Sequence, residues 1–415
     1  ENIDIIDKNI TLGSYFITNQ DTSFIEQTIL TGGLNVEDLD STSFIGGLSI
    51  KDDPVGLYIL NSDGLRSSNM HIENSRGVSI DNSDVELSEF VVHNNNNNRT
   101  SGNSFDNGGG GIRLRDSYLI LNKSIIDSNN TIQGSGGGIF SENSSLVLDS
   151  VNITENNSSG YTGAGIYLTS SSEDSVIITN SVIKENITTS YGGGIYYGSQ
   201  ITLSLMDVRV DSNFANRGGG VYGHGSLYAY NSTFNYNMGF HNQNDGRGGG
   251  LYIDGSQNDY LFNQCMIQGN TTYSNGGGLF VGNNVFNTFE IVNSLITDNE
   301  VLITDDNGYH GGGGIYTEAN GSSTSMKIIH TTIANNKSNA RNGGILRSGN
   351  TNIDLINSIV WHNTAVSHYP NMYESGSTFI NSNVGGITST INTDPLFVDN
   401  YNGDYRLSDY SPSIG

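Results

Sequence analysis

Two short motifs recur along most of the chain and stay in step with each other. The first is a glycine-rich run followed by an aliphatic residue, and its copies end at Ile112, Ile139, Ile166, Ile195, Val221, Leu251, Leu279, Ile315 and Ile345. The second is an apolar residue, two variable residues and asparagine, and its copies are Ile126–Asn129, Ile153–Asn156, Ile183–Asn186, Val210–Asn213, Phe234–Asn237, Ile267–Asn270, Ile296–Asn299, Ile333–Asn336 and Val360–Asn363, with a looser copy at Val91–Asn94. Such a repeat favours a solenoid of stacked units.

The segments between the two motifs have the pattern of β-strands. Residues 145–153 and 175–183 alternate apolar and polar side chains, and this period of two is typical of strands with one buried face. No segment has a sustained helical period or a helix start signal. Two or three short strands cannot bury their apolar face alone, and units of roughly 27 residues suit a three-sided coil. The sequence therefore predicts an all-β fold, a right-handed parallel β-helix of about a dozen coils.

Each motif has an expected place in such a coil. The aliphatic residues after the glycine runs would stack inside, and the asparagines would form an internal ladder in which each amide pairs with the next coil. The glycines would supply a positive φ and close backbone approach at a corner. We expect a single domain over residues 1–415, with irregular coils in 1–80, regular coils in 81–365 and a closing segment in 366–415.

The charge of the chain limits its partners. Asp and Glu total 42 against 17 Lys and Arg, for a formal charge of −25, and such a surface repels nucleic acid and anionic lipid. A polyanionic glycan would need a cation between it and the protein, so Ca²⁺ is the one cofactor that the composition suggests. The sequence identifies no metal ligands. No apolar stretch approaches the ~20 residues that a membrane-spanning helix needs.

The single cysteine and the chain start bear on the compartment. Cys265 has no partner for an intrachain disulfide. It occupies a repeat position that other coils fill with Ser181, Ser232, Ser294, Thr331 and Ser358, which predicts a small buried side chain. The chain begins within the repeat pattern and shows no signal peptide, so we expect it to be trimmed from a longer, exported precursor. The sequence does not indicate an oligomeric state.

The paired motifs resemble the GGA-I and FxxN repeats of polymorphic outer-membrane proteins and related autotransporter passengers. The resemblance covers about residues 80–365; Phe234–Asn237 matches FxxN literally, and the other copies have Ile or Val. The tail, residues 393–415, is similar to the closing segment of many secreted bacterial β-helix proteins, and residues 1–16 are similar to their early coils. These families imply a right-handed parallel β-helix, export, and a surface or adhesive role. They do not imply an enzyme.

A candidate ligand site lies where polar side chains precede the glycine runs. Tyr191, Arg217, Arg247 and His310 stand just before these runs, and the two arginines occupy adjacent coils. Paired guanidinium groups in so acidic a chain favour an anionic partner such as a carboxylate or sulfate. The alternative is that an acid such as Asp245 neutralises them in ordinary surface ion pairs.

Three further features point to ligand binding on this edge. Long segments precede the glycine runs at 95–107, 238–247 and 300–310, and such insertions either form a binding surface or drift neutrally. His224 and Asp254 share a column on adjacent coils. An aromatic follows most of the aliphatics, at Phe140, Tyr167, Tyr196, Tyr222, Tyr252, Phe280 and Tyr316. These rings would point outward, where they either hold sugar rings or stack on one another.

Together these features favour an extracellular or cell-surface protein that is adhesive or binds glycan without catalysis. The alternatives are a polysaccharide lyase or glycoside hydrolase of the β-helix type, and a purely structural stalk. The tripeptide at 223–225 matches the GHG motif of polygalacturonase-like hydrolases, but Asp305 and Asp306 follow it in the wrong order and no RIK-like segment is present. We therefore predict no catalytic residues.

Overall fold

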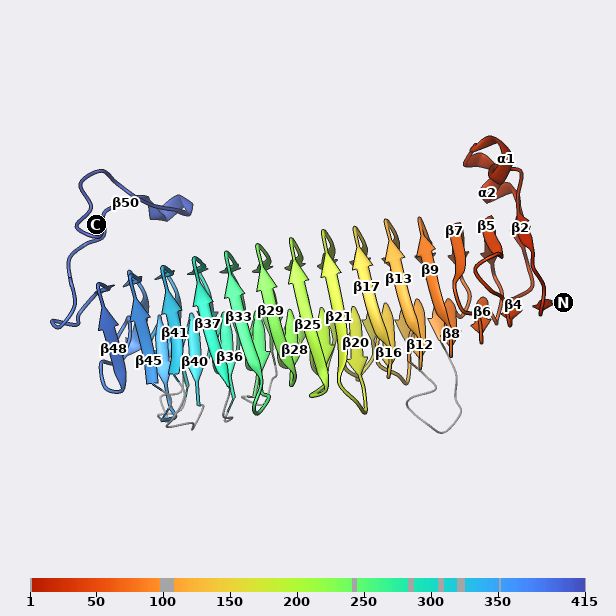
Figure 1. Cartoon of the computed structure of the whole chain (residues 1–415). Coiled ribbons are helices and arrows are strands. Elements are labelled where there is room, and N and C mark those ends of the chain that lie inside the picture. The colour runs from red at the N-terminus through yellow and green to blue at the C-terminus, as the bar shows by residue number, and fades with distance from the viewer. Residues whose placement is uncertain are drawn as a thin grey trace. The chain divides into compact units, whose positions relative to one another are not determined.

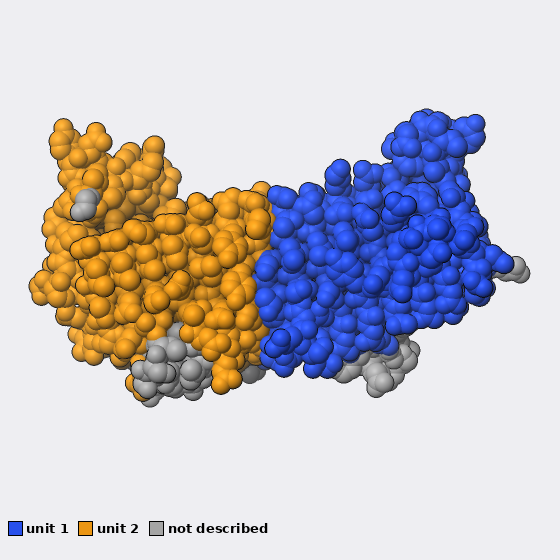
Figure 2. Space-filling model, viewed as in Figure 1, with its two compact units in different colours: residues 1–204 blue, residues 205–415 orange. Residues whose placement is uncertain are grey.

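The computed structural model describes residues 2–97, 108–240, 245–282, 287–304, 310–318, 325–350 and 352–414. The chain divides into two compact units, unit 1 (Glu1–Ser204) and unit 2 (Leu205–Gly415), coloured blue and orange in Figure 2. Within each unit, successive coils pair strand to strand in parallel (Figure 1). The predicted class, an all-β parallel β-helix of about a dozen coils, is confirmed.

The strands of unit 1 form three parallel sheets. The first sheet has the order β1 (Ile3–Ile6), β4 (Leu34–Glu37), β6 (Leu57–Leu60), β8 (Val78–Asp81), β12 (Ile112–Arg115), β16 (Ile139–Glu142), β20 (Ile166–Thr169) and β24 (Ile195–Tyr197). The second sheet contains β2 (Thr11–Gly13), β3 (Ile29–Leu30), β5 (Phe44–Lys51), β7 (Leu65–Glu73), β9 (Asp84–Ser88), β10 (Val91–His93), β13 (Tyr118–Asn122), β14 (Ile125–Asp127), β17 (Ser145–Asp149), β18 (Asn152–Thr154), β21 (Asp174–Thr179) and β22 (Val182–Lys184). The third contains β11 (Asn96–Asn97), β15 (Asn130–Thr131), β19 (Asn157–Ser158) and β23 (Ile187–Thr188).

The early coils of unit 1 differ from the later ones. Two helices, α1 (Phe16–Asn19) and α2 (Ser23–Gln27), lie between β2 and β3, although the sequence shows no helical period. Each helix is about one turn long, too short for a period to appear in the sequence. The third sheet begins only at β11, so the coils before it have no strand on that side among the described residues.

Neither helix has the length or hydropathy to span a membrane, within the residues described.

Unit 2 repeats the three-sided plan. Its first sheet is β28 (Val221–Gly223), β32 (Leu251–Ile253), β36 (Leu279–Val281), β40 (Ile315–Thr317) and β44 (Ile345–Arg347). Its second sheet contains β26 (Arg209–Asp211), β29 (Ser226–Tyr230), β30 (Thr233–Asn235), β33 (Asp259–Asn263), β34 (Met266–Gln268), β37 (Thr288–Val292), β38 (Leu295–Thr297), β41 (Ser325–Ile329), β42 (Thr332–Ala334), β45 (Asn352–Ile356), β46 (Ile359–Trp361), β48 (Ser377–Ile380) and β49 (Asn383–Val384), and β25 (Ile201–Met206) contains the boundary between the units. Its third sheet is β27 (Phe214–Ala215), β31 (Met238–Gly239), β35 (Thr271–Thr272), β39 (Glu300–Val301), β43 (Lys337–Arg341) and β47 (Thr364–Ser367).

A short C-terminal segment follows the coils of unit 2. Strands β50 (Phe397–Asp399) and β51 (Asp404–Leu407) pair antiparallel, and the 3₁₀-helix η1 (Asn400–Asn402) joins them. This segment makes hydrogen bonds back to the second sheet, as described below.

The core is the stack of aliphatic residues that the first motif predicts. In unit 1, Ile112, Ile139, Ile166 and Ile195 lie in register on successive strands, and each is fully buried. In unit 2 the equivalent stack consists of Val221, Leu251, Leu279, Ile315 and Ile345, which are also buried. The side-chain prediction is therefore confirmed in both units.

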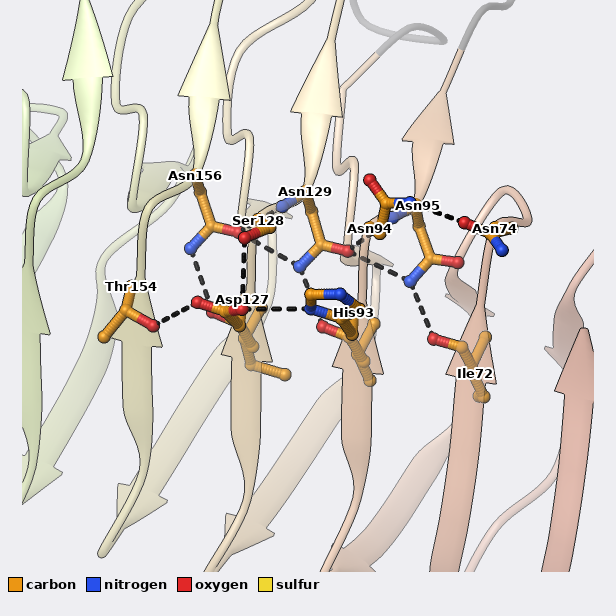
Figure 3. Close-up of polar contacts among 12 residues, drawn as sticks. Ile72, Asn74, His93, Asn94, Asn95, Asp127, Ser128, Asn129, Thr154 and Asn156 are labelled. Carbon is orange, nitrogen blue, oxygen red and sulfur yellow. Dashed lines mark hydrogen bonds and ion pairs between the residues drawn. The ribbon is translucent and has the colours of Figure 1, made fainter. Parts of the chain in front are cut away.

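The second motif forms the predicted asparagine ladder. The side chain of Asn156 donates hydrogen bonds to the Ile126 carbonyl (2.9 Å) and to Asn186 Oδ1 (3.0 Å), as partly drawn in Figure 3. Its own Oδ1 accepts from both the backbone N–H (2.9 Å) and the side-chain amide (3.0 Å) of Asn129. The looser copy at Val91–Asn94 is wrong by one residue, because Asn95 is the buried residue that bonds to Asn129 and Asn94 takes a φ of 53° in the turn before it.

The glycine runs stay in phase with the ladder because they pack against it. A Cβ on Gly138, the last glycine of its run, would lie 3.0 Å from Asn156 Nδ2 and 2.6 Å from the Gly165 carbonyl oxygen. Gly136, the first of the same run, has a φ of 68°, which side chains rarely allow. The two motifs thus form one structural unit, in which the glycines make room for the asparagine of the same coil.

Cys265 occupies the small buried position that the repeat predicts. Its backbone N–H donates to Ser294 Oγ (3.0 Å), as the N–H of Ser358 donates to Ser382 Oγ (3.2 Å) at this position in another coil. Burial raises the pKa of the thiol to about 11. The thiol therefore stays protonated at neutral pH and is a poor nucleophile.

Candidate functional site

Five charged side chains gather on the outer side of the first sheet of unit 2. We call Arg217, Asp245, Arg247, Asp254 and Glu318 the charged face. Arg217 and Arg247 lie side by side in a parallel bridge between adjacent coils, as the sequence predicts. Asp254 and Glu318 directly follow β32 and β40, respectively. The register of these strands brings residues that are far apart in sequence onto one surface.

The charged face is a chain of ion pairs. Asp245 binds Arg217 through one oxygen, and its other oxygen lies 3.3 Å from Arg247 Nε. Arg247 Nη1 lies 3.5 Å from Glu318 Oε1. The side chains of both arginines and of Glu318 are 23% to 30% exposed, so these pairs are partly shielded from solvent. The expected neutralisation by Asp245 is therefore present, and it extends to a second acid that the sequence analysis did not name.

The acids lie in one column with His224. The register that pairs Gly223, Ile253, Val281 and Thr317 places His224, Asp254, Gly282 and Glu318 at equivalent positions on successive coils. His224 Nδ1 lies 2.8 Å from the Asp254 carbonyl oxygen. Because a carbonyl oxygen only accepts, Nδ1 carries the proton, and Nε2 is the acceptor in the neutral ring.

The glycine of this column leaves room between the two acids. A Cβ on Gly282 would lie 2.4 Å from Asp254 Oδ1, so the Asp254 carboxylate extends over Gly282 toward the coil of Glu318. Burial raises the pKa of Glu318; Arg247 opposes this shift, and the charge of Asp254 adds to it. The hydroxyl of Tyr252 donates to Asp254 Oδ2 at 3.4 Å, and burial raises the pKa of that tyrosine well above its usual range. Glu318 is thus a carboxyl group that releases its proton less readily than an exposed one.

In unit 2 the aromatic column does not provide the open platform for sugars that we considered. Tyr222, Tyr252, Phe280 and Tyr316 stack on one another with ring centroids 4.5 to 5.2 Å apart, and each is 5% exposed or less. In unit 1, Phe140, Tyr167 and Tyr196 stack in the same way. In unit 2 the rings point outward by alternation, but the arginines before the glycine runs cover two of them. The guanidinium of Arg217 lies 5.9 Å from the Tyr252 ring centroid, and that of Arg247 lies 5.3 Å from Phe280.

Two other residues of the predicted site are placed differently. Tyr191 is half-buried and belongs to unit 1, whereas the charged face belongs to unit 2. His310 is one residue out of register with the arginines, because Gly311 pairs with Asn275 and Arg341 in their column. The glycine run after His310 has four glycines instead of three, and its first glycine occupies the position that the arginines hold in other coils. The residue before the run is therefore displaced by one position. Much of the three long segments, and Asp305 and Asp306, lie outside the described residues.

Glu318 was not predicted as part of the site, and Tyr252 was predicted only as a member of the aromatic column. The signal for Glu318 is present, because it lies three residues after the motif aliphatic Ile315, as Asp254 does after Leu251. Tyr252 was assigned to the aromatic column, and its contact with Asp254 follows from the turn that β32 makes at its end.

A second polar group missed by the sequence analysis lies on the second sheet of unit 1. His93 Nδ1 is 2.9 Å from Asp127 Oδ2, and Thr154 and Ser128 also donate to the Asp127 carboxylate (Figure 3). His93, Asp127 and Thr154 each follow the apolar residue of the second motif, and β10, β14 and β18 bring them side by side. Aligning that motif position across coils would have found the group. The carboxylate has three side-chain partners from its own sheet and the adjoining turn, which is typical of a structural role.

Comparison with protein families gives one match over less than half of the chain. Residues 14–204 match the family described as periplasmic copper-binding protein (NosD), and not the polymorphic outer-membrane proteins that the motifs resemble. Copper sites in proteins favour clustered Cys, Met or His ligands. Within the described parts of the chain, no group of three or more His, Cys, Asp or Glu side chains could hold a metal ion.

Comparison with solved structures identifies the fold. A search of curated proteins gives no match. The crystal structure of the periplasmic alginate epimerase AlgG aligns with a TM-score of 0.54 and 8% identity, over 92% of this chain and 85% of that one. A mannuronic acid-specific polysaccharide family 6 lyase from human gut microbiota aligns with a TM-score of 0.31 and 11% identity, over 91% of each chain. The chain is thus similar in its N-terminal half to the NosD family and in its fold to a periplasmic alginate epimerase.

Proposed function

We propose that this chain is an exported protein that binds a neutral glycan on the charged face of unit 2 without catalysing its cleavage. The observation that carries the proposal is the unbroken chain of paired donors and acceptors from Arg217 through Asp245 and Arg247 to Glu318. Sugar hydroxyls both donate and accept hydrogen bonds, so a row of guanidinium and carboxylate groups can bind several of them at once. The strands beneath hold these groups at fixed positions.

Charge favours a neutral glycan over an anionic one. The charged face carries two arginines and three acids, and both arginines already have carboxylate partners. An anionic sugar would have to displace an acid and approach a chain whose formal charge is −25. A neutral sugar can bond to the outer edges of the ion pairs without breaking them.

Export and carbohydrate binding also agree with the comparisons, which support the proposal from outside the site. The matched family is described as periplasmic, and the aligned epimerase is a periplasmic protein that acts on a polysaccharide. We extend the location to this chain as part of the proposal. An adhesive surface role and a purely structural stalk are the competing interpretations.

The test is direct measurement of glycan binding by the full chain. We expect at least one neutral oligosaccharide in a mixed panel of neutral and uronate-containing glycans to bind in isothermal titration calorimetry. The double variant Arg217→Ala/Arg247→Ala should lose at least about tenfold in affinity, because both donors are removed. Arg209→Ala is the matched control, since Arg209 pairs with Asp211 at 2.8 Å on the second sheet of the same unit. Equal affinity for the parent and the double variant, or tighter binding of the uronates, would exclude the proposal.

One observation favours a second candidate, an inverting glycoside hydrolase. Asp254 and Glu318 are separated by the single strand β36, so their backbones lie about 9.6 Å apart at two strand spacings. The Asp254 carboxylate extends over Gly282 toward the coil of Glu318, which brings the two carboxyl groups closer together than their backbones. Inverting hydrolases hold their acid and base carboxyls ~6.5–9.5 Å apart, and the raised pKa of Glu318 suits the acid. Release of reducing ends by the parent, abolished in Glu318→Gln but not in Arg209→Ala, would establish this activity. Binding without release leaves the non-catalytic function in place.

A further inference from the structure

Unit 2 contains a cavity between its second sheet and the C-terminal segment. Its volume is about 620 Å³, within the range of ~300–1,000 Å³ that is typical of small-molecule sites. One wall is the turn between the two strands of the second sheet in successive coils, at His330, Asn357 and Asn381. The opposite wall includes Leu407 and Pro412 of the C-terminal segment. None of these residues belongs to the charged face.

The C-terminal segment is bonded to the coils on both sides of the cavity. The side chain of Asn383 donates to the Thr393 carbonyl (2.6 Å) and to Ser413 Oγ (2.8 Å). Farther along the sheet, the hydroxyl of Tyr405 lies 3.2 Å from both oxygens of Asp298 and accepts from Asn335 Nδ2 at 3.0 Å. With these attachments, the cavity exists before any ligand binds.

At the turn between the two strands of the second sheet, the side chains differ from coil to coil: Asn231 is hydrogen-bonded, whereas Gln264 and Asn293, like the turn residues of the cavity wall, make no side-chain hydrogen bond within the described part of the chain. At the same turn position, the side chain of Asn231 donates to Asp207 of the preceding coil. His330, Asn357 and Asn381 have the same backbone conformation, with φ of 49°, 49° and 47°. Their side chains make no hydrogen bond to any other residue in the described part of the chain. The side chains of His330, Asn357 and Asn381 are therefore available to a ligand where the C-terminal segment faces this turn.

The lining specifies the chemistry of the ligand. Among the described residues that line the cavity there is no Asp, Glu, Lys or Arg, so nothing in the wall compensates a charged ligand. The lining combines the amides of Asn357 and Asn381 and the His330 imidazole with the apolar side chains of Leu407, Pro412 and Ile391, so the cavity is both polar and apolar. A pyranose has hydroxyls at its edge and an apolar ring face, which matches both parts of this lining.

We propose that this cavity is a second ligand site, separate from the charged face, that takes a neutral saccharide of one or a few sugar rings. The inference stands on the cavity alone and does not depend on the proposed function. Asn357 and Asn381 bind the sugar hydroxyls, and the apolar residues of the C-terminal segment contact the ring.

The test uses maltose, cellobiose, lactose and N,N′-diacetylchitobiose as probes, with digalacturonate as the charged comparator, titrated into the full chain. The double variant Asn357→Gly/Asn381→Gly removes both amides and keeps the positive φ, because glycine adopts it without strain. Asn293→Gly is the matched control, an exposed residue with a φ of 49° at the same turn outside the cavity lining. A second variant, Thr332→Val, removes a hydroxyl from the lining with almost no change in shape.

We expect at least one neutral disaccharide to bind, with an affinity at least about tenfold lower in the double glycine variant and unchanged in Asn293→Gly. The glycine variants are also titrated in the Arg217→Ala/Arg247→Ala background, in which the charged face is disabled, so that the binding that remains there, and its loss in the double glycine variant, reports the cavity alone. The inference is overturned if none of the four disaccharides binds at millimolar concentration. It is also overturned if the double glycine variant binds as tightly as the parent, or if digalacturonate binds as tightly as the neutral probes.

Discussion

Replacing one ladder asparagine should destabilise the protein far more than replacing an exposed asparagine of the same coil. The side chain of Asn156 makes four hydrogen bonds, two as donor and two as acceptor, and it is fully buried. In Asn156→Ala the Asn129 N–H loses its acceptor and the Ile126 carbonyl loses a donor, both away from water. At about 1–3 kcal/mol for each buried group left unpaired, the free energy of unfolding should fall by about 2–6 kcal/mol.

Asn152→Ala is the control, because Asn152 is exposed on β18 of the same coil and should change stability by about 0.5 kcal/mol or less. Urea denaturation followed by circular dichroism measures both variants, and hydrogen exchange measures the Asn129 amide. We expect a lower midpoint and faster exchange of that amide only in Asn156→Ala. Equal midpoints for the two variants, or an Asn129 amide that stays protected, would show that the ladder does not hold the coils together.

Three more changes test the packing and electrostatics. Gly138→Ala should lower the free energy of unfolding by about 1–3 kcal/mol, because the new Cβ would lie 2.6 Å from the Gly165 carbonyl oxygen. Gly198→Ala is the control and should be tolerated, because no atom lies nearer than 3.6 Å to its new Cβ. Thermal melts compare the two variants. The thiol of Cys265, with a pKa of about 11, should resist iodoacetamide at pH 8 until the protein is unfolded, and full labelling of the native chain would contradict its burial. The pKa of Glu318 is raised in the folded state, so its ionisation opposes folding and stability falls as the pH rises through that pKa. Arg247→Ala should raise the pKa of Glu318 further, because it removes the positive charge beside that carboxyl group. A carboxyl titration followed by ¹³C NMR measures this pKa, and a lower pKa in the variant would contradict the ion pair between Arg247 and Glu318.

The parts of the fold that could be predicted from the sequence are those that repeat. The aliphatic stack and the asparagine ladder recur at the same place in each coil, so a local motif reports a three-dimensional position. The prediction was wrong by one residue where the motif is looser, at Asn94 and Asn95, because two adjacent asparagines both fit the spacing.

The site could be predicted only where it follows the same periodicity. Arg217, Arg247, His224 and Asp254 are brought together because they occupy equivalent positions in adjacent coils. The burial of the aromatic column in unit 2 depends on Arg217 and Arg247, which lie over the Tyr252 and Phe280 rings. The alternation of residues along one strand predicts that the rings point outward, but it cannot predict that side chains from outside the strand cover them. The cavity depends on a C-terminal segment that occurs once, so no repeat could indicate where it packs.

The proposed function is tested most directly by a crystal structure of the full chain soaked with the neutral glycan that binds best in the titration panel. We expect the glycan on the outer side of β28, β32, β36 and β40, with its hydroxyls bonded to Arg217, Arg247 and at least one of Asp245, Asp254 and Glu318. A glycan found only in the cavity beside Asn357 and Asn381, with the charged face bare, would contradict the proposed function and leave the cavity as the binding site.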